Sequence, residues 1–287
     1  MNVQVFDERR CILGEGPVWH AATGRVVWLD ILSCLIRWRS LEGEVGEVTM
    51  PRHIGALLPA ADGTWLAFLV DGVYRLTADF GSPRLLIEFP HRLPPVAGEP
   101  QIRANDAKVA PDGRVFCGTM PYDWQGQPGA AALYLLDPTG LQLVDQATIS
   151  NGLGWSPDGT AMYYIDTPLG GVDVFDVAPT GEVSGRRPLL RLPTGSGYPD
   201  GMTVDSAGGL WVAVWEGSRV QRYTPDGQPA GQIELPAARV TSCAFIGPEL
   251  RHLVITTASI EDDNPAAGLT YLTEVDVPGQ PQPLALL

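Results

Sequence analysis

The sequence predicts an all-β fold, namely a six-bladed β-propeller with four-stranded antiparallel blades around a central channel. An apolar strand-like run, a tight turn and a second strand recur six times along the 287 residues. The residues at these turns are 39, 50, 46, 49 and 42 positions apart. A period of about 40 to 50 residues built from strands and turns is typical of a radial array of blades. The turn residues are Gly24, Gly63, Gly113, Gly159, Gly208 and Leu250.

Each unit is expected to contain two hairpins. The inner hairpins are apolar on both strands, as packing between neighbouring blades requires: Gly16–Ile31, Leu57–Leu69, Ala107–Met120, Leu153–Asp166, Met202–Trp215 and Cys243–Ala258. The outer segments have one wetter face, as Val172 and Val174 alternate with Asp173. They are predicted at Leu35–Val45, Val73–Phe80, Leu133–Leu141, Val172–Val183, Val220–Gln228 and Leu269–Gly279.

The whole chain, residues 1–287, is interpreted as one propeller domain. Its 33 glycines and 26 prolines are scattered through every repeat, as an all-β chain with many turns requires. The first and last blades of a propeller meet at a joint, so a closing device is expected. Val3, Val5 and Phe6 are predicted to add a strand to the final blade.

Composition and charge argue against several classes of partner and cellular location. The formal net charge of −14 disfavours nucleic acid and anionic membranes, which require a basic face. No apolar stretch approaches the roughly 20 residues that span a bilayer, and the first residues lack the pattern of a signal peptide. The four cysteines have no CxxC spacing, so free thiols in a cytoplasmic protein are expected: Cys11, Cys34, Cys117 and Cys243.

A polar ring is predicted at one mouth of the channel. The innermost strand of each blade lines a propeller's channel, so residues at one offset from the turn should meet around the axis. Counting back eight residues from the turn residue, or nine in the first unit with its longer turn, gives a polar residue in five of six units. These positions are Glu15, Gly55, Asn105, Asn151, Asp200 and Ser242.

This ring suggests a cation site. Glu15 and Asp200 would repel each other in a sheltered channel unless they were protonated or neutralised by a cation. Carboxylate and amide oxygens form a hard ligand set suited to Ca²⁺, Mg²⁺ or Mn²⁺. We therefore expect a divalent cation bound by Glu15, Asn151 and Asp200. The other interpretation is a hydrogen-bonded polar plug that fills the channel without metal.

Several further residues stand near this mouth. Arg103 precedes Asn105 by two positions and offers a guanidinium suited to sugar hydroxyls or a carboxylate. His53 precedes Gly55 by two positions, and whether it reaches the site is left open. The acidic residues after the second strands are expected to act mostly as loop caps or supports for ligands: Asp30, Asp123, Asp166 and Glu216.

Four segments resemble the regucalcin, gluconolactonase and senescence-marker-protein family: Leu13–Trp19, Arg103–Met120, Ser150–Gly159 and Tyr198–Ala213. The resemblance spans nearly the whole chain. It implies a six-bladed propeller with a mononuclear metal site, in which Glu15, Asn151 and Asp200 bind the metal and Asp200 is also the general base. It further implies that Arg103 and Asn105 bind substrate. Some members have a substrate-contacting glutamate where this chain has Asp123, so Asp123 is also expected to bind substrate. Its shorter side chain leaves contact with a particular sugar open.

The expected function is metal-dependent hydrolysis of a sugar 1,4- or 1,5-lactone to the aldonic acid. Ca²⁺ is the first choice of metal, with Zn²⁺, Mn²⁺, Mg²⁺ or Fe(II) as alternatives. Two other functions stay open: a non-catalytic calcium-binding propeller, and a related metal-dependent esterase or phosphotriesterase. The sequence does not identify the sugar, and either a monomer or a weak homo-oligomer is compatible with it.

Overall fold

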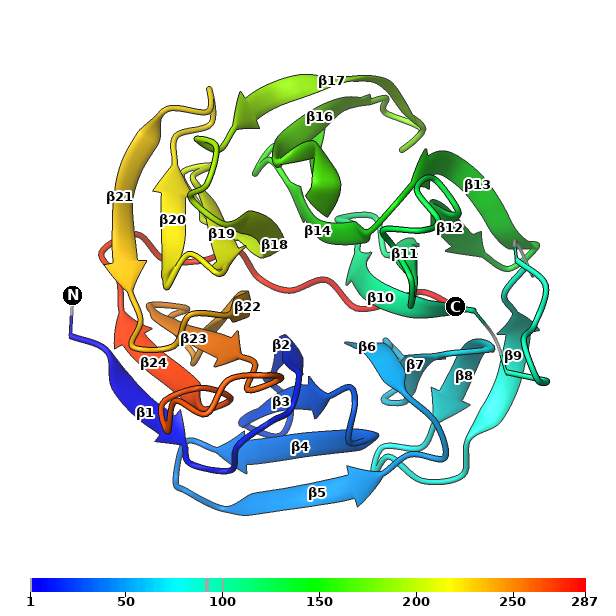
Figure 1. Cartoon of the computed structure of the whole chain (residues 1–287), viewed down its shortest axis with the longest axis horizontal. Coiled ribbons are helices and arrows are strands. Elements are labelled where there is room, and N and C mark those ends of the chain that lie inside the picture. The colour runs from blue at the N-terminus through cyan, green and yellow to red at the C-terminus, as the bar shows by residue number, and fades with distance from the viewer. Residues whose placement is uncertain (1, 91–92, 100) are drawn as a thin grey trace.

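The computed structural model describes residues 2–90, 93–99 and 101–287, so residues 1, 91, 92 and 100 of the predicted domain lie outside the described residues. Six four-stranded antiparallel sheets surround a central axis (Figure 1), which confirms the predicted six-bladed propeller. One 3-10 turn, η1 (Thr167–Leu169), is the only helical segment in these ranges. None of the residues described forms a helix long and apolar enough to cross a membrane.

Five blades are meanders whose strands follow one another outward from the channel. The first contains β2 (Gly14–His20), β3 (Arg25–Asp30), β4 (Leu35–Ser40) and β5 (Val45–Thr49). The second contains β6 (Ile54–Pro59), β7 (Trp65–Leu69), β8 (Gly72–Leu76) and β9 (Arg84–Glu88). The third contains β10 (Ile102–Val109), β11 (Val115–Pro121), β12 (Ala131–Asp137) and β13 (Gly140–Ala147).

The fourth and fifth blades repeat this arrangement. The fourth contains β14 (Ser150–Trp155), β15 (Ala161–Asp166), β16 (Gly171–Val177) and β17 (Val183–Arg191). The fifth contains β18 (Tyr198–Val204), β19 (Leu210–Trp215), β20 (Arg219–Tyr223) and β21 (Pro229–Glu234). The predicted outer segments ended too early, because the fourth strands face solvent and carry few apolar residues; β5, for example, alternates between exposed and half-buried positions.

The sixth blade joins the two ends of the chain. Its strands β22 (Val240–Ile246), β23 (His252–Thr257) and β24 (Thr270–Glu274) are completed by β1 (Gln4–Asp7). Val5 pairs with Tyr271 on β24, so the predicted closing strand is confirmed, although it begins one residue after Val3. The predicted outer segment Leu269–Gly279 is corrected, because the chain leaves the sheet after β24.

The predicted turn positions have the backbone conformation that the repeat requires. Gly208 has φ 83°, in the left-handed region that glycine enters without steric penalty. Leu250, at the same position of the sixth unit, also has positive φ, 53°. The sixth turn therefore keeps the geometry of the others in spite of its side chain.

Apolar side chains between neighbouring blades hold the inner strands in place. Every residue of β6, β14 and β22 is buried. Trp65 of the second blade packs in one cluster with Val27 and Leu29 of the first. All four cysteines are free, as predicted, and Cys11, Cys117 and Cys243 are buried in this packing.

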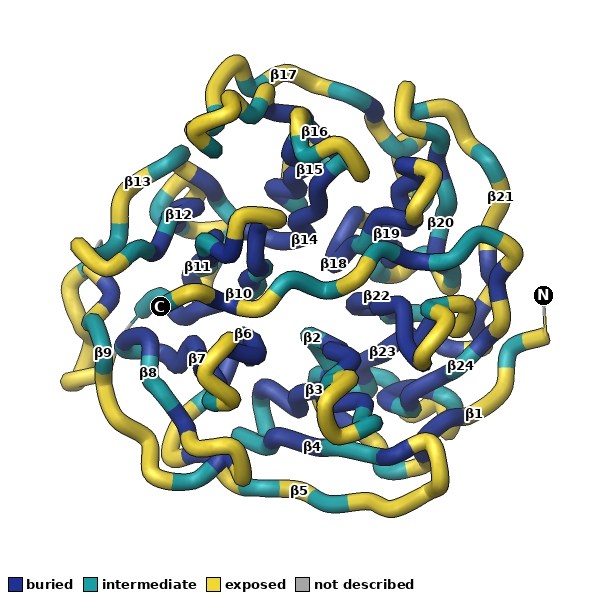
Figure 2. The backbone as a smooth tube through the Cα atoms, turned by 180° about the vertical axis from the view of Figure 1, so that it is seen from behind, coloured by how far each residue is buried: buried dark blue, intermediate teal, exposed yellow. Residues whose placement is uncertain are grey.

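The C-terminal segment crosses the face of the propeller that carries the inner hairpin turns (Figure 2). It begins at the sixth blade, where the Gly279 amide donates to the Leu250 carbonyl. It ends between the second and third blades, where Leu286 donates to Gly113 and Ala285 exchanges backbone hydrogen bonds with Pro59 and Ala61. The segment thus covers the channel mouth opposite the starts of the inner strands.

Candidate metal and active site

The six ring positions all lie near the starts of the inner strands, at the same end of the channel. Glu15, Gly55 and Asn151 are second in their strands, Asp200 and Ser242 are third, and Asn105 is fourth. Hydrogen bonds connect neighbouring blades at this level. Asn105 Nδ2 donates to the Ser150 carbonyl at 3.1 Å, and Thr241 Oγ1 donates to the Gly14 carbonyl at 2.5 Å. The structure therefore brings together strands that are far apart in sequence.

A break in strand pairing marks this level in every blade. The pairing of the inner strand with its neighbour shifts register at or directly beside the ring position in all six sheets. Such bulges re-aim side chains and are frequent beside active sites. Here they free the residues at the ring from the regular alternation of a strand.

The inner strands approach so closely that some positions exclude a side chain. A Cβ atom on Gly55 would lie 2.2 Å from the carbonyl oxygen of Ala104. One on Gly152 would lie 2.6 Å from the carbonyl oxygen of Asp200. Glycine at these two positions lets the second blade contact the third, and the fourth contact the fifth, at the level of the ring.

Asn151 and Asp200 are in direct contact. Asn151 Nδ2 donates to Asp200 Oδ1 at 2.5 Å and to Thr167 Oγ1 at 3.1 Å, so both amide hydrogens are used. Thr167 Oγ1 in turn donates to the Pro199 carbonyl at 2.9 Å. This network fixes the Asn151 amide, and its Oδ1 is the atom that Asn151 can offer to a cation.

Asp200 is a buried acid, Glu15 is a half-buried one, and their negative charges interact. Burial raises the pKa of Glu15 well above its usual value, and the charges of Asp200 and Asp106 raise it further. Burial also raises the pKa of Asp200 to about 8, against the opposing hydrogen bond from Asn151. A positive charge beside these two acids would stabilise their ionised forms and so lower their pKa values.

Arg103 and Asn105 form a second pair at the same mouth. Arg103 is only 6% exposed, and its Nη1 donates to Asn105 Oδ1 and to the Ala104 carbonyl, both at 2.8 Å. Burial lowers the pKa of Arg103, whereas the charges of Glu15 and Asp200 oppose that effect. The guanidinium is thus within electrostatic reach of both candidate metal-binding acids.

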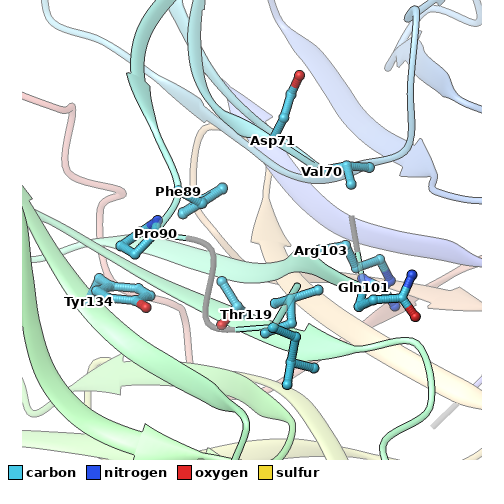
Figure 3. Close-up of a pocket in the computed structure, with 10 residues that line it drawn as sticks. Val70, Asp71, Phe89, Pro90, Gln101, Arg103, Thr119 and Tyr134 are labelled. Carbon is cyan, nitrogen blue, oxygen red and sulfur yellow. The ribbon is translucent and has the colours of Figure 1, made fainter. Parts of the chain in front are cut away.

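A small pocket lies against Arg103 (Figure 3). It is lined also by Phe89 after β9, Thr119 of β11 and Tyr134 of β12. Its volume is about 20 Å³, enough for about one water molecule. This pocket is therefore too small for a sugar lactone.

Asp123 lies on the exposed loop after β11. Its Oδ1 accepts a hydrogen bond from the Gly126 amide at 3.0 Å, which stabilises the loop turn. No hydrogen bond or ion pair joins it to Arg103 or Asn105 within the described part of the chain. Its predicted contact with substrate stays a prediction.

Like Asp123, two other acidic residues that were expected to cap loops do so. Asp30 accepts hydrogen bonds from the amides of Ile12 and Leu13, both at 3.0 Å. Asp166 accepts one from the Ile149 amide at 2.9 Å. Each carboxylate holds the segment that leads into a ring residue, Glu15 in the first case and Asn151 in the second.

Asp106 is a third acid at the site that the sequence reasoning missed. Its charge raises the pKa values of both Glu15 and Asp200. A signal was available in the repeat, since the residue after the ring position is small or a thiol in the other five units: Gly16, Ala56, Gly152, Gly201 and Cys243. A charged residue at this position stands out only when the six units are compared.

The donor set suits a hard divalent cation. The buried carboxylate of Asp200, the half-buried carboxylate of Glu15 and the fixed amide of Asn151 provide oxygen donors of the kind that Ca²⁺, Mg²⁺ and Mn²⁺ prefer. The described residues include no cluster of three or more His, Cys, Asp or Glu side chains that could hold a metal. The candidate set has only two such side chains, so an amide ligand and water would complete it.

The fold and this mouth define a class of protein, a six-bladed propeller with acidic and amide side chains where its inner strands begin. Residues 13–259 match the family described as SMP-30/Gluconolactonase/LRE-like region. The chain belongs to this family.

Individual relatives cover the chain almost completely. Regucalcin of Danio rerio is 37% identical, over 98% of this chain and 97% of its own. Pentonolactonase XacC of Haloferax volcanii is 34% identical, over 98% and 97%. The crystal structure of a calcium-binding protein, regucalcin, from Agrobacterium tumefaciens superposes with a TM-score of 0.91 at 29% identity, covering 100% and 98%. Lactonase and calcium-binding names thus both occur among these relatives.

Proposed function

We propose that this protein is a metal-dependent hydrolase that opens sugar lactones to aldonic acids. The observation that carries the proposal is the meeting of Asn151 and Asp200 in a hydrogen-bonded pair, within electrostatic reach of Glu15 and Arg103. The family includes a pentonolactonase that is similar over nearly its full length, which supports a sugar lactone as substrate. Glu15, Asn151 and Asp200 would hold the cation.

The reaction requires a base, a means to stabilise negative charge and a means to orient the substrate. A bound divalent cation supplies polarisation of the lactone carbonyl and stabilisation of the oxyanion. Asp200, as carboxylate, takes a proton from the attacking water, whose oxygen bonds to the carbonyl carbon. When the bond from that carbon to the ring oxygen breaks, the ring oxygen receives the proton from Asp200. The product is the open-chain aldonic acid, and Asp200 is a carboxylate again.

Arg103 and Asn105 would orient the sugar. The hydrogen bond from Arg103 to Asn105 fixes both side chains before any ligand arrives, which lowers the entropy lost on binding. A guanidinium and an amide are suited to hydroxyl groups on the lactone ring. Holding the ring at this position would align its carbonyl for attack, an effect that contributes strongly to catalysis.

The test is a lactone panel assayed by acid release at constant pH, with metal-stripped and reloaded protein. We expect hydrolysis of glucono-, xylono-, arabinono- or galactonolactone that is lost on stripping and restored by a divalent cation. Stoichiometric Ca²⁺ binding without turnover on any lactone would instead favour a calcium-binding protein, like the regucalcin of Agrobacterium tumefaciens. Full activity in the stripped protein would contradict the proposed role of the metal.

A further inference from the structure

His53 and Tyr122 form a hydrogen-bonded pair at the same mouth of the channel. His53 Nδ1 lies 2.8 Å from the Tyr122 hydroxyl, and the ring centroids are 5.9 Å apart. The two residues are 69 positions apart in sequence and belong to different blades. The pair therefore bridges the second and third blades.

The fold holds each partner in place. His53 directly precedes β6, which contacts β10 so closely that Gly55 has no room for a Cβ atom beside Ala104. Tyr122 directly follows β11, and its amide donates to the Gln101 carbonyl at 3.1 Å. Because β11 pairs with β10, Tyr122 stands next to the strand that carries Arg103.

The pair lies near the Arg103 guanidinium. After burial, the charge of Arg103 is the next cause that lowers the pKa of His53, and it also counteracts the burial effect on the pKa of Tyr122. Yet Tyr122 is 43% exposed, whereas Arg103 is 6% exposed. The pair thus stands at the solvent-facing edge of a site whose charged residues are buried.

The chemistry of the pair matches a polyol. One hydrogen is shared between His53 Nδ1 and the Tyr122 hydroxyl. If the hydroxyl donates it, His53 Nε2 carries a hydrogen and the phenol oxygen can accept; if Nδ1 donates it, the roles are reversed. In either tautomer the pair offers a second molecule one donor and one acceptor, which is what two neighbouring hydroxyl groups can bind.

We propose that the His53–Tyr122 pair is a specificity-determining wall of the active site, which binds sugar hydroxyls and so favours polyhydroxylated lactones over unsubstituted ones. The proposal rests on the proposed lactonase function for its kinetic consequence. It assigns these two residues to the positioning of substrate and gives them no part in proton transfer at the carbonyl.

The first test compares glucono-1,5-lactone with δ-valerolactone, which lacks hydroxyl groups. Tyr122→Phe should lower kcat/KM for the sugar lactone about tenfold, mainly through KM, the effect of losing roughly one hydrogen bond. The decrease in kcat/KM for δ-valerolactone should be at least about fivefold smaller, because this lactone has no hydroxyl group to form that hydrogen bond. His53→Gln should give the same pattern, and Tyr223→Phe, which removes a phenol hydroxyl from the outer strand β20, serves as the matched control. Parallel losses on both lactones would overturn the proposal.

The second test is independent of turnover. Metal-loaded wild type and variants are titrated calorimetrically with 1,5-anhydro-D-glucitol, a cyclic polyol without a carbonyl group. We expect binding by the wild type that is about tenfold weaker in Tyr122→Phe, again the loss of about one hydrogen bond. If no lactone is hydrolysed, the lactonase function fails but this result still supports a polyol site. Equal affinity in all variants, or no binding by the wild type, would overturn the pair's role.

Discussion

The two ends of the central channel are made by the same six strands and differ in almost every physical property. At the mouth where these strands begin, strand pairing is interrupted and the side chains include Glu15, Asn151 and Asp200. At the other end the strands finish in tight turns, and the C-terminal segment covers them (Figure 2). The proposed function is therefore assigned to the mouth with these side chains, whereas the other mouth is covered by the chain itself.

The covered end still contains a cavity of about 440 Å³. It is lined by apolar side chains such as Val18, Trp155 and Phe245, and also by Asp106 and the ring residue Ser242. The C-terminal residues 280–283 form one wall. Lys108 reaches into it from β10 and donates to the Met202 carbonyl at 2.9 Å. The cavity thus extends from the covered end to the level of the polar ring at the acidic end. The variants described next test whether the two ends are independent.

The largest effect is expected for Asp200→Asn at the acidic end. Loss of a general base typically lowers turnover about 10²- to 10⁴-fold, and the amide keeps the size of the side chain, so the fold should persist. Steady-state lactone hydrolysis at saturating metal measures the turnover, and a melting curve for each protein measures the stability of the fold. Retention of more than about a tenth of the rate would be incompatible with such a base.

Asn151→Ala should act on the metal more than on the chemistry. Removing a ligand should weaken cation affinity by at least about tenfold, the range seen even for residues that only support a ligand. Metal titration of the stripped protein measures it, and Asn105→Ala is the control because Asn105 is assigned to substrate. Equal cation affinity in Asn151→Ala and wild type would place Asn151 outside the ligand set.

Cation affinity should rise with pH. Burial raises the pKa of Asp200 to about 8 in the cation-free protein, so below that pH a proton must leave before the carboxylate can bind. Below about pH 8 the apparent affinity should increase about tenfold per pH unit for each proton released. Titrations at pH 6, 7, 8 and 9 check this. A flat affinity from pH 6 to 8 would contradict the buried state of the acids.

The smallest effect on the site is expected from deleting residues 280–287. The deletion removes the hydrogen bonds of Gln280, Ala285 and Leu286 to the turns, each contributing about 0.5 to 1.5 kcal/mol. The free energy of unfolding should fall by about 2 to 4 kcal/mol, measured by denaturant titration. Cation affinity should change less than about twofold, because the deletion removes no hydrogen bond of Glu15, Asn151 or Asp200. A parallel loss of affinity would show that the two ends are coupled.

The fold could be predicted from the sequence because each repeat consists of short segments, strands and tight turns, that are recognisable one by one. Turn residues such as Gly208 fix the register of each hairpin. An offset of eight residues from the turn, or nine in the first unit, locates Glu15, Asn151 and Asp200 at one level. The closing strand around Val5 was also visible, because the last blade needed a partner.

Other features depend on contacts that no local pattern encodes. The path of the C-terminal segment is set by hydrogen bonds to five blades, and its residues show no strand period. The pair of His53 and Tyr122 forms only because β6 packs against β10. The place of Asp106 at the site was not predicted, because a single acid in an apolar strand stands out only when the six units are aligned.

The most direct measurement is the anomalous diffraction of a crystal soaked in Mn²⁺. If the account is right, a single strong peak will lie on the channel axis, about 2.0 to 2.6 Å from oxygen atoms of Glu15, Asn151 and Asp200. A peak bound elsewhere, or no peak in crystals of protein that hydrolyses lactones, would contradict it.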